Sequence, residues 1–246
     1  MSQSLRAALA AALVMASGFA HTARAMSVTP VHSEMTSAGN QSRSQVTVTN
    51  TGTAPMPVET GLQRVHLDEN GERKMSVAGD EFLVFPPQAI IPPGGTQVFR
   101  LQWVGEPMLA ESQSYMFNVS QVPVKFPKGT SKVQVVMNFG VIINVAGNTG
   151  APSLKVTNTS ITTDKQGKRR VVMTVENPTK THALLPEGKI SLAGGSWQGS
   201  LSPTELSEKI GIGLVQPGKR RKFVLPIDVP ANVTTVQASL DYKPKR

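Results

Sequence analysis

The sequence contains no cysteine among its 246 residues. Such a chain has no disulfide bond, no thiol nucleophile and no Cys-ligated zinc site. Aromatic residues are also scarce, at 5%, whereas Gly (21) and Pro (18) are frequent. Outside the N-terminus, no long apolar segment has a helical repeat. We therefore predict a chain of strands and turns whose fold depends on its apolar core alone.

The motifs of enzymes and metal proteins are missing as well. Neither G-x-S-x-G nor G-x-x-x-x-G-K-[ST] occurs, and no pair of His residues has the spacing H-x-x-x-H or H-E-x-x-H. Acidic residues are few and dispersed, which gives paired acid–base chemistry no support. We predict that the protein is not an enzyme and that it has no catalytic residue, cofactor or metal.

The first 25 residues predict a cleaved secretory signal peptide. Arg6 supplies a positive charge, residues 7–20 are apolar, and Ala23-Arg24-Ala25 matches a small-x-small cleavage site. The apolar run is too short for a typical membrane span, and no second run follows it. We expect an exported protein with no stable membrane insertion.

Basic residues exceed acidic ones, and the formal net charge is +9. The basic residues cluster at 168–170, at 219–222 and at the C-terminus. Charges of this kind at turns and strand edges guard a sheet against aggregation. Because we expect export, we predict no nucleic-acid partner.

The clearest pattern in the sequence lies at residues 132–145, where every odd position is apolar. This alternation predicts a strand with one apolar face. Its fourteen residues exceed the roughly 3–10 of most strands. Part of the strand is therefore expected at a sheet edge, where unpaired backbone groups can recruit a foreign strand. An ordinary core strand is the alternative.

Two sets of strands are expected on either side of a short linker. About seven short strands precede residue 146, and turn signals such as Asn70-Gly71 separate them. Residues 146–150 (A-G-N-T-G) form the candidate linker, and a second, smaller set of strands follows. We predict an all-β protein with a signal peptide at 1–25, a first domain at 26–147 and a second at 148–246.

Several motifs occur in the order typical of one protein family. Residues 85–101 (F-P-P-Q-A-I-I-P-P-G-G-T-Q-V-F-R-L) are similar to its P-P…L-x-P-G…R-L signature. Residues 115–123 (Y-M-F-N-V-S-Q-V-P) are similar to its Y-x-x-N-x-x-E-x-P segment, with Gln121 where Glu is usual. Residues 132–145 stand where the family has its long G1 strand, and residues 176–179 (E-N-P-T) match a turn of its second domain. The chain thus resembles the periplasmic pilus (fimbrial) assembly chaperones of the PapD type, from the chaperone–usher pathway.

This resemblance implies two immunoglobulin-like β-sandwich domains in a boomerang arrangement, located in the periplasm. It also implies a chaperone that binds, stabilises and caps pilus subunits by donor-strand complementation and delivers them to an outer-membrane usher. The donor side chains would be Val133, Val135, Met137 and Phe139. A homodimer in which two copies cap each other's apolar strands is a further expectation.

The sequence departs from the family pattern where the subunit's terminal carboxylate is anchored. The family uses an Arg on the first strand and a Lys on G1, and these positions are His32 and Ile142 here. The resemblance therefore implies a divergent branch. We consider Arg100 and His32 as candidate carboxylate anchors. Weaker candidates are Arg43, Lys125 and Lys132.

A second departure concerns the contact between the domains. The family has an Arg that forms an interdomain salt bridge, and Ala146 falls near its position. We expect other contacts to set the domain orientation. The alternative to a chaperone is an exported immunoglobulin-like adhesin or structural pilus component, which would have one incomplete domain.

Overall fold

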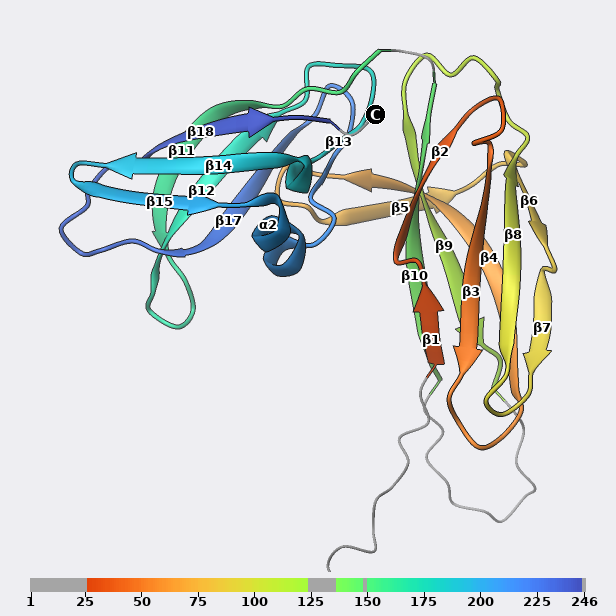
Figure 1. Ribbon diagram of the computed structural model, residues 1–246. Helices are drawn as coiled ribbons and strands as arrows, with labels where there is room; N and C mark the ends of the chain where they lie inside the picture. The colour runs from red at the N-terminus through yellow and green to blue at the C-terminus, as the bar shows by residue number, and fades with distance from the viewer. Residues whose placement is uncertain (1–25, 124–135, 148–149, 245–246) are drawn as a thin grey trace, which may run out of the picture.

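The computed structural model describes residues 26–123, 136–147 and 150–244. The predicted signal peptide and two of the predicted donor residues, Val133 and Val135, lie outside the described residues. Figure 1 shows two β-rich domains joined into a bent, boomerang-like molecule. The predicted all-β architecture of two sandwiches is confirmed. The domain boundary at residues 147–148 stays a prediction.

The first domain is a sandwich of two sheets. One sheet consists, in spatial order, of β1 (Met26–Thr29), β3 (Arg43–Asn50), β8 (Thr96–Trp103) and β6 (Phe82–Phe85). The other consists of β2 (His32–Thr36), β10 (Asn138–Ala146), β9 (Gln113–Gln121), β4 (Met56–Leu67) and β5 (Arg73–Val77), with β7 (Gln88–Ile91) paired to β4. Alternate residues of the two sheets face each other and form one apolar core.

The N-terminal run of the first domain divides between the two sheets. Pro30 separates β1 from β2, since proline cannot donate to a strand ladder. β1 pairs antiparallel with β3, and β2 pairs parallel with β10. Both strands lie at the edge of their sheet, as the proline predicted.

The predicted Asn-Gly turn is present and joins β4 to β5. Asp68 Oδ1 accepts hydrogen bonds from the backbone N–H groups of Asn70 and Glu72, both at 2.9 Å. Gly71 has φ +86°, which favours glycine. The resulting hairpin extends toward the second domain (Figure 1).

The second domain contains the strands β11 to β18. One sheet has β11 (Lys155–Thr163), β12 (Arg169–Glu176) and β17 (Arg220–Asp228). Another has β15 (Trp197–Leu201), β14 (Gly188–Gly194) and β18 (Gln237–Tyr242). The short strands β13 (Ala183–Leu184) and β16 (Leu214–Val215) pair with each other. The 3₁₀ turn η1 (Leu185–Glu187) directly follows β13 and is not part of this pairing.

The sequence reasoning missed the helix α2 (Pro203–Ile210) of the second domain. Its local signal is a capping box. The Ser202 hydroxyl accepts from Glu205 N, and the Glu205 carboxylate accepts from Ser202 N at 2.9 Å. The hydrogen bond from Ser202 N, and a second from the Ser202 hydroxyl at 2.8 Å, hold the pKa of the Glu205 carboxyl below its usual range. The helix lies on the concave side of the bend (Figure 1).

Candidate functional site

One edge of β10 is only partly covered. β10 pairs along its length with β9, but β2 covers its other edge only from Ile142 to Ala146. Among the described residues, no strand pairs with residues 138–141 at that edge. Backbone N–H and C=O groups there are available to another strand.

The structure describes only residues 136–145 of the predicted donor strand. The described strand begins at Asn138, and Val136 and Met137 lie outside it. Met137 packs partly against the core of the first domain, whereas the Phe139 side chain is 37% exposed. Phe139 therefore lies within the free edge of β10 and Met137 directly before it, and their role as donor residues stays a prediction.

A groove of about 890 Å³ separates the two domains on the concave side. Residues of β2, including His32 and Glu34, line one wall together with Arg43. Glu187 and the first turns of α2 line the other wall. The groove begins where β2 stops covering β10, since Val31 and His32 belong to both features.

The carboxylates of this groove already have hydrogen-bond donors. Glu34 accepts from Asn144 Nδ2 at 2.9 Å and lies 2.6 Å from His182 Nε2. Glu187 accepts from the Tyr242 hydroxyl at 2.8 Å. In the described part of the chain, neither the His32 nor the Arg43 side chain forms an ion pair. The positive charge of Arg43, and that of His32 when it is protonated, is therefore not paired with a carboxylate of the groove.

The two positions of the family's anchor are direct neighbours in the structure, because Ile142 is the register partner of His32. Ile142 is only 6% exposed. It belongs to an apolar cluster that joins the domains, with Val65 and Met116 from the first domain and Leu184 and Leu214 from the second. Ile142 thus supports the domain contact.

Arg100, the other candidate anchor, lies elsewhere. It is exposed on β8, in the opposite sheet from His32, so the structure does not bring the two candidates together. Two rows of register partners cross this sheet. They are Arg43–Gln102–Leu83 and Gln45–Arg100–Phe85. We call these six residues the outer-face patch, and they line a shallow hollow of about 620 Å³.

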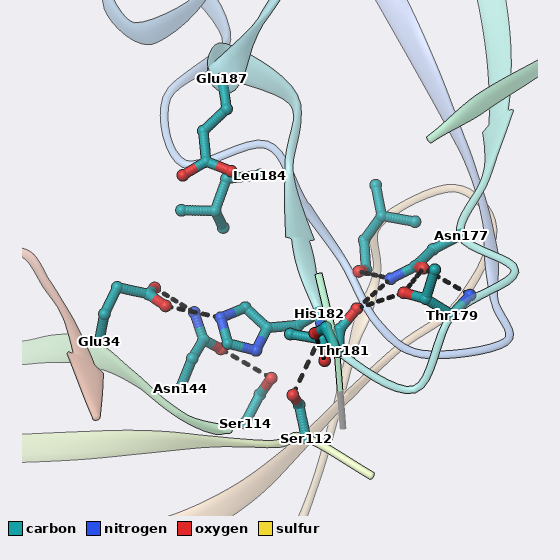
Figure 2. Close-up of polar contacts among 12 residues, drawn as sticks. Glu34, Ser112, Ser114, Asn144, Asn177, Thr179, Thr181, His182, Leu184 and Glu187 are labelled. Carbon is teal, nitrogen blue, oxygen red and sulfur yellow. Dashed lines mark hydrogen bonds and ion pairs between the residues drawn. The ribbon is translucent and has the colours of Figure 1, made fainter. Parts of the chain in front are cut away.

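A polar network between the domains was not predicted (Figure 2). Its centre is His182, which reaches Glu34 of β2. Glu34 is also bonded to Asn144 of β10, and Asn144 accepts a hydrogen bond from Ser114 at 2.8 Å. No local sequence signal connects residues 34 and 182. The E-N-P-T turn at 176–179, which precedes His182, is the nearest hint.

The tip of the β4–β5 hairpin forms the other domain contact. The Gln216 side chain accepts from Leu67 N and donates to Val65 O, both at 2.8 Å. Arg221 packs against Gly71 and over the Phe223 ring. Burial, together with nearby Arg73, lowers the pKa of the Arg221 guanidinium. The predicted reliance on contacts other than a family-type Arg at residue 146 fits these observations.

The described residues offer little for other chemistry. They contain no group of three or more His, Cys, Asp or Glu residues that could hold a metal ion. None of their helices is long and apolar enough to cross a membrane.

Comparisons with known proteins agree with this architecture. Residues 27–145 match the family model described as pili and flagellar-assembly chaperone, PapD N-terminal domain. No curated protein sequence matches the chain. The match to solved structures is extensive, and three examples follow.

The first is the CsuC–CsuE chaperone–tip adhesion subunit pre-assembly complex from Acinetobacter baumannii. One of its chains is 17% identical, with 90% of this chain and 100% of that chain covered and a TM-score of 0.53. The class 5 fimbriae chaperone CfaA is 13% identical over 90% and 94% of the two chains, with a TM-score of 0.53. The SafA pilin–SafB chaperone complex of Salmonella enterica gives 16% identity, coverage of 84% and 86%, and a TM-score of 0.52. At such identities the likeness concerns the fold, which is that of two immunoglobulin-like domains.

The apolar contact around Ile142 leads to a first prediction. Ile142→Lys restores the family's residue but places an ammonium group among Val65, Met116 and Leu184. Burying an unpaired charge there is expected to lower the free energy of unfolding by about 2 kcal/mol or more. Urea unfolding followed by tryptophan fluorescence measures the change.

Ile142→Val is the matched control, because it removes one methyl group and should cost only about 0.5–1.5 kcal/mol. A Lys variant as stable as the Val variant would show that position 142 tolerates a charge and that the cluster is not tightly closed.

Proposed function

The chain belongs to the PapD-type family of pilus-assembly chaperones, and we propose that it holds a pilus subunit on its own β10 in the periplasm. The observation that supports this most is the free edge of β10 at residues 138–141, next to the partly exposed Phe139. The uncovered part of this edge has room for one further strand, which would pair with it through backbone hydrogen bonds.

The proposed mechanism is donor-strand complementation. The subunit's strand pairs with the free edge of β10, and the backbone hydrogen bonds supply affinity. Phe139 and Met137, with Val133 and Val135 beyond the described residues, fill pockets of the subunit at alternate positions. The apolar groove of an incomplete subunit is then covered, which keeps the subunit from aggregating.

Charge in the interdomain groove supports a position for the end of the subunit. A strand that runs along β10 toward Ile142 leads to His32, and Arg43 lines the same groove. We assign the anchor for a terminal carboxylate to His32 with Arg43. Arg100 is not part of this anchor, because it does not line the groove that His32 and Arg43 share.

The outer-face patch is the proposed binding surface for the usher. Leu83 and Phe85 are exposed there beside Arg100, which forms no ion pair in the described part of the chain. Arg43 stands at the border of the patch, because it also lines the interdomain groove. Arg and aromatic side chains are enriched in protein interfaces. Since the patch and the free edge of β10 belong to different sheets, a chaperone that holds a subunit can present the patch to an usher. This arrangement describes a binding protein with no catalytic step.

A test of donor-strand binding uses Phe139→Asp. Burial of a Phe side chain contributes about 1.5–3 kcal/mol, so its replacement by a charge is expected to weaken subunit binding roughly 10- to 100-fold. The measurement is the yield of co-purified subunit after co-expression, followed by titration of the purified partners. Val224→Asp, which places the same charge at an exposed apolar position of the second domain, is the control. Equal subunit yields from both variants would refute donor-strand binding through Phe139.

The proposed anchor makes subunit binding depend on pH. Only the protonated imidazole attracts a carboxylate, so affinity is expected to fall several-fold as the pH rises from about 5 to about 8. Isothermal titration of the chaperone with subunit measures this. Glu34, Glu187 and His182 lie in or beside the groove and can also respond to pH. His32→Lys is therefore the decisive comparison, since Lys keeps its charge and should flatten the profile. A His32→Lys variant with the original pH profile would place the anchor elsewhere.

The usher assignment is tested separately with Phe85→Asp. Because Phe85 and β10 belong to different sheets, the variant is expected to retain subunit binding while losing affinity for the usher about tenfold or more. Binding of the purified chaperone–subunit complex to immobilised usher is the readout. Unchanged usher binding would remove the outer-face patch from the proposal.

A further inference from the structure

The loop that carries His182 is built to hold its side chain in the first domain. Asn177 is buried and donates from Nδ2 to Thr181 O at 2.8 Å and to Val215 O at 3.0 Å. Its Oδ1 accepts from Thr179 N and from the Thr179 hydroxyl. Three of these four hydrogen bonds join residues 177, 179 and 181, directly before His182 (Figure 2). Hydrogen bonds within the second domain alone therefore brace the backbone of this loop.

The first domain receives this loop at three points. Ser112 N donates to Lys180 O at 2.9 Å, and His182 N donates to the Ser112 hydroxyl at 3.1 Å. The imidazole of His182 is 0% exposed and lies 2.6 Å from Glu34. We call Glu34, Ser112, Ser114, Asn144 and His182 the joint.

The joint includes the donor strand itself. Asn144 is fully buried and lies on β10 only two residues beyond Ile142. Its amide donates to Glu34 and accepts from Ser114, so Asn144 of β10 links β9 to the Glu34 carboxylate of β2. A turn of the second domain about the linker would pull His182 from Glu34 and leave this buried network incomplete. Such a loss is costly, because partly satisfied buried polar networks are less stable than complete ones.

The ion pair at the hairpin contact is too exposed to fix the orientation of the domains in place of the joint. Lys222 and Glu69 are 3.6 Å apart, but their side chains are 44% and 42% exposed. Exposed ion pairs of this kind contribute little. The Gln216 hydrogen bonds form on β4, away from the groove wall that β2 provides. The His182–Glu34 contact of the joint connects the second domain directly to that wall.

We propose that Glu34 and His182 are positioning residues that set the orientation of the second domain and thereby the shape of the groove beside β10. The part of this inference that concerns subunit binding rests on the proposed function. Loss of either side chain leaves two folded domains with a wider range of relative orientations.

The lack of cysteine makes the orientation directly measurable. Gln88 on β7 and Ser191 on β14 are exposed, one in each domain, and Gln88→Cys with Ser191→Cys provides two spin-label sites without background. Pulsed electron–electron double resonance then gives the distribution of distances between the two spin labels, one in each domain. The parent protein is expected to show one narrow distribution. His182→Phe, which keeps a ring but no hydrogen-bond donor, and Glu34→Ala should both broaden or shift it.

Three further variants make the result specific. Glu187→Ala removes a carboxylate from the same groove, but Glu187 is bonded to Tyr242 within the second domain, so the distance distribution should not change. His182→Gln keeps a side-chain donor for Glu34 and should restore part of the narrow distribution. Combining Glu34→Ala with His182→Phe should change the distribution little more than either variant alone, because both break one contact.

Each outcome decides between the two parts of the inference. Distributions that superimpose for the parent, His182→Phe and Glu34→Ala would overturn the positioning role. A broadened distribution with unchanged subunit affinity would overturn the link to binding while the positioning role stands. Loss of about fivefold or more in subunit affinity, together with broadening, supports both parts. If Phe139→Asp fails to weaken subunit binding, the proposed function fails, and the distance measurement still judges the joint.

Discussion

The structure depends on the several contacts that β10 makes at once. Val141, Ile143 and Val145 enter the core of the first domain. Ile142 and Asn144, on the other face, contact the second domain through an apolar cluster and a polar network. Because strand side chains alternate, a single segment can hold both domains while one stretch of its edge stays free. Changes in β10 therefore affect the core, the domain contact and the proposed binding edge together.

The interdomain groove differs from the family pattern in a coherent way. Ile142 stands where a Lys is expected, and its side chain is used for domain packing. His32, its register partner, remains at the groove with Arg43. An apolar residue gains stability from burial that a Lys there would lose to desolvation. At position 142 the chain thus has an apolar side chain that serves domain packing where the family pattern has a Lys, and His32 and Arg43 line the groove.

Sequence reasoning succeeded where the signal was local. The Asn70-Gly71 hairpin, the break at Pro30 and the apolar alternation from Val141 to Val145 occur as predicted, since each reflects backbone or side-chain preferences within a few residues. The family signatures at residues 85–101 and 115–123 led to the immunoglobulin-like fold. The capping box at Ser202 and Glu205 was an equally local signal that was overlooked, and so α2 was missed.

By itself the sequence determined the all-β class, the two sets of strands, the apolar face of β10 and the departures at His32 and Ile142. Only the tertiary structure decided what those departures do. It placed Ile142 in the domain contact, put Arg100 on the opposite sheet, and brought Glu34 to His182 across a separation of 148 residues. The physical reason is that hydropathy patterns record which side chains prefer burial, whereas the partner of a buried polar group depends on how two separately formed sandwiches pack against each other.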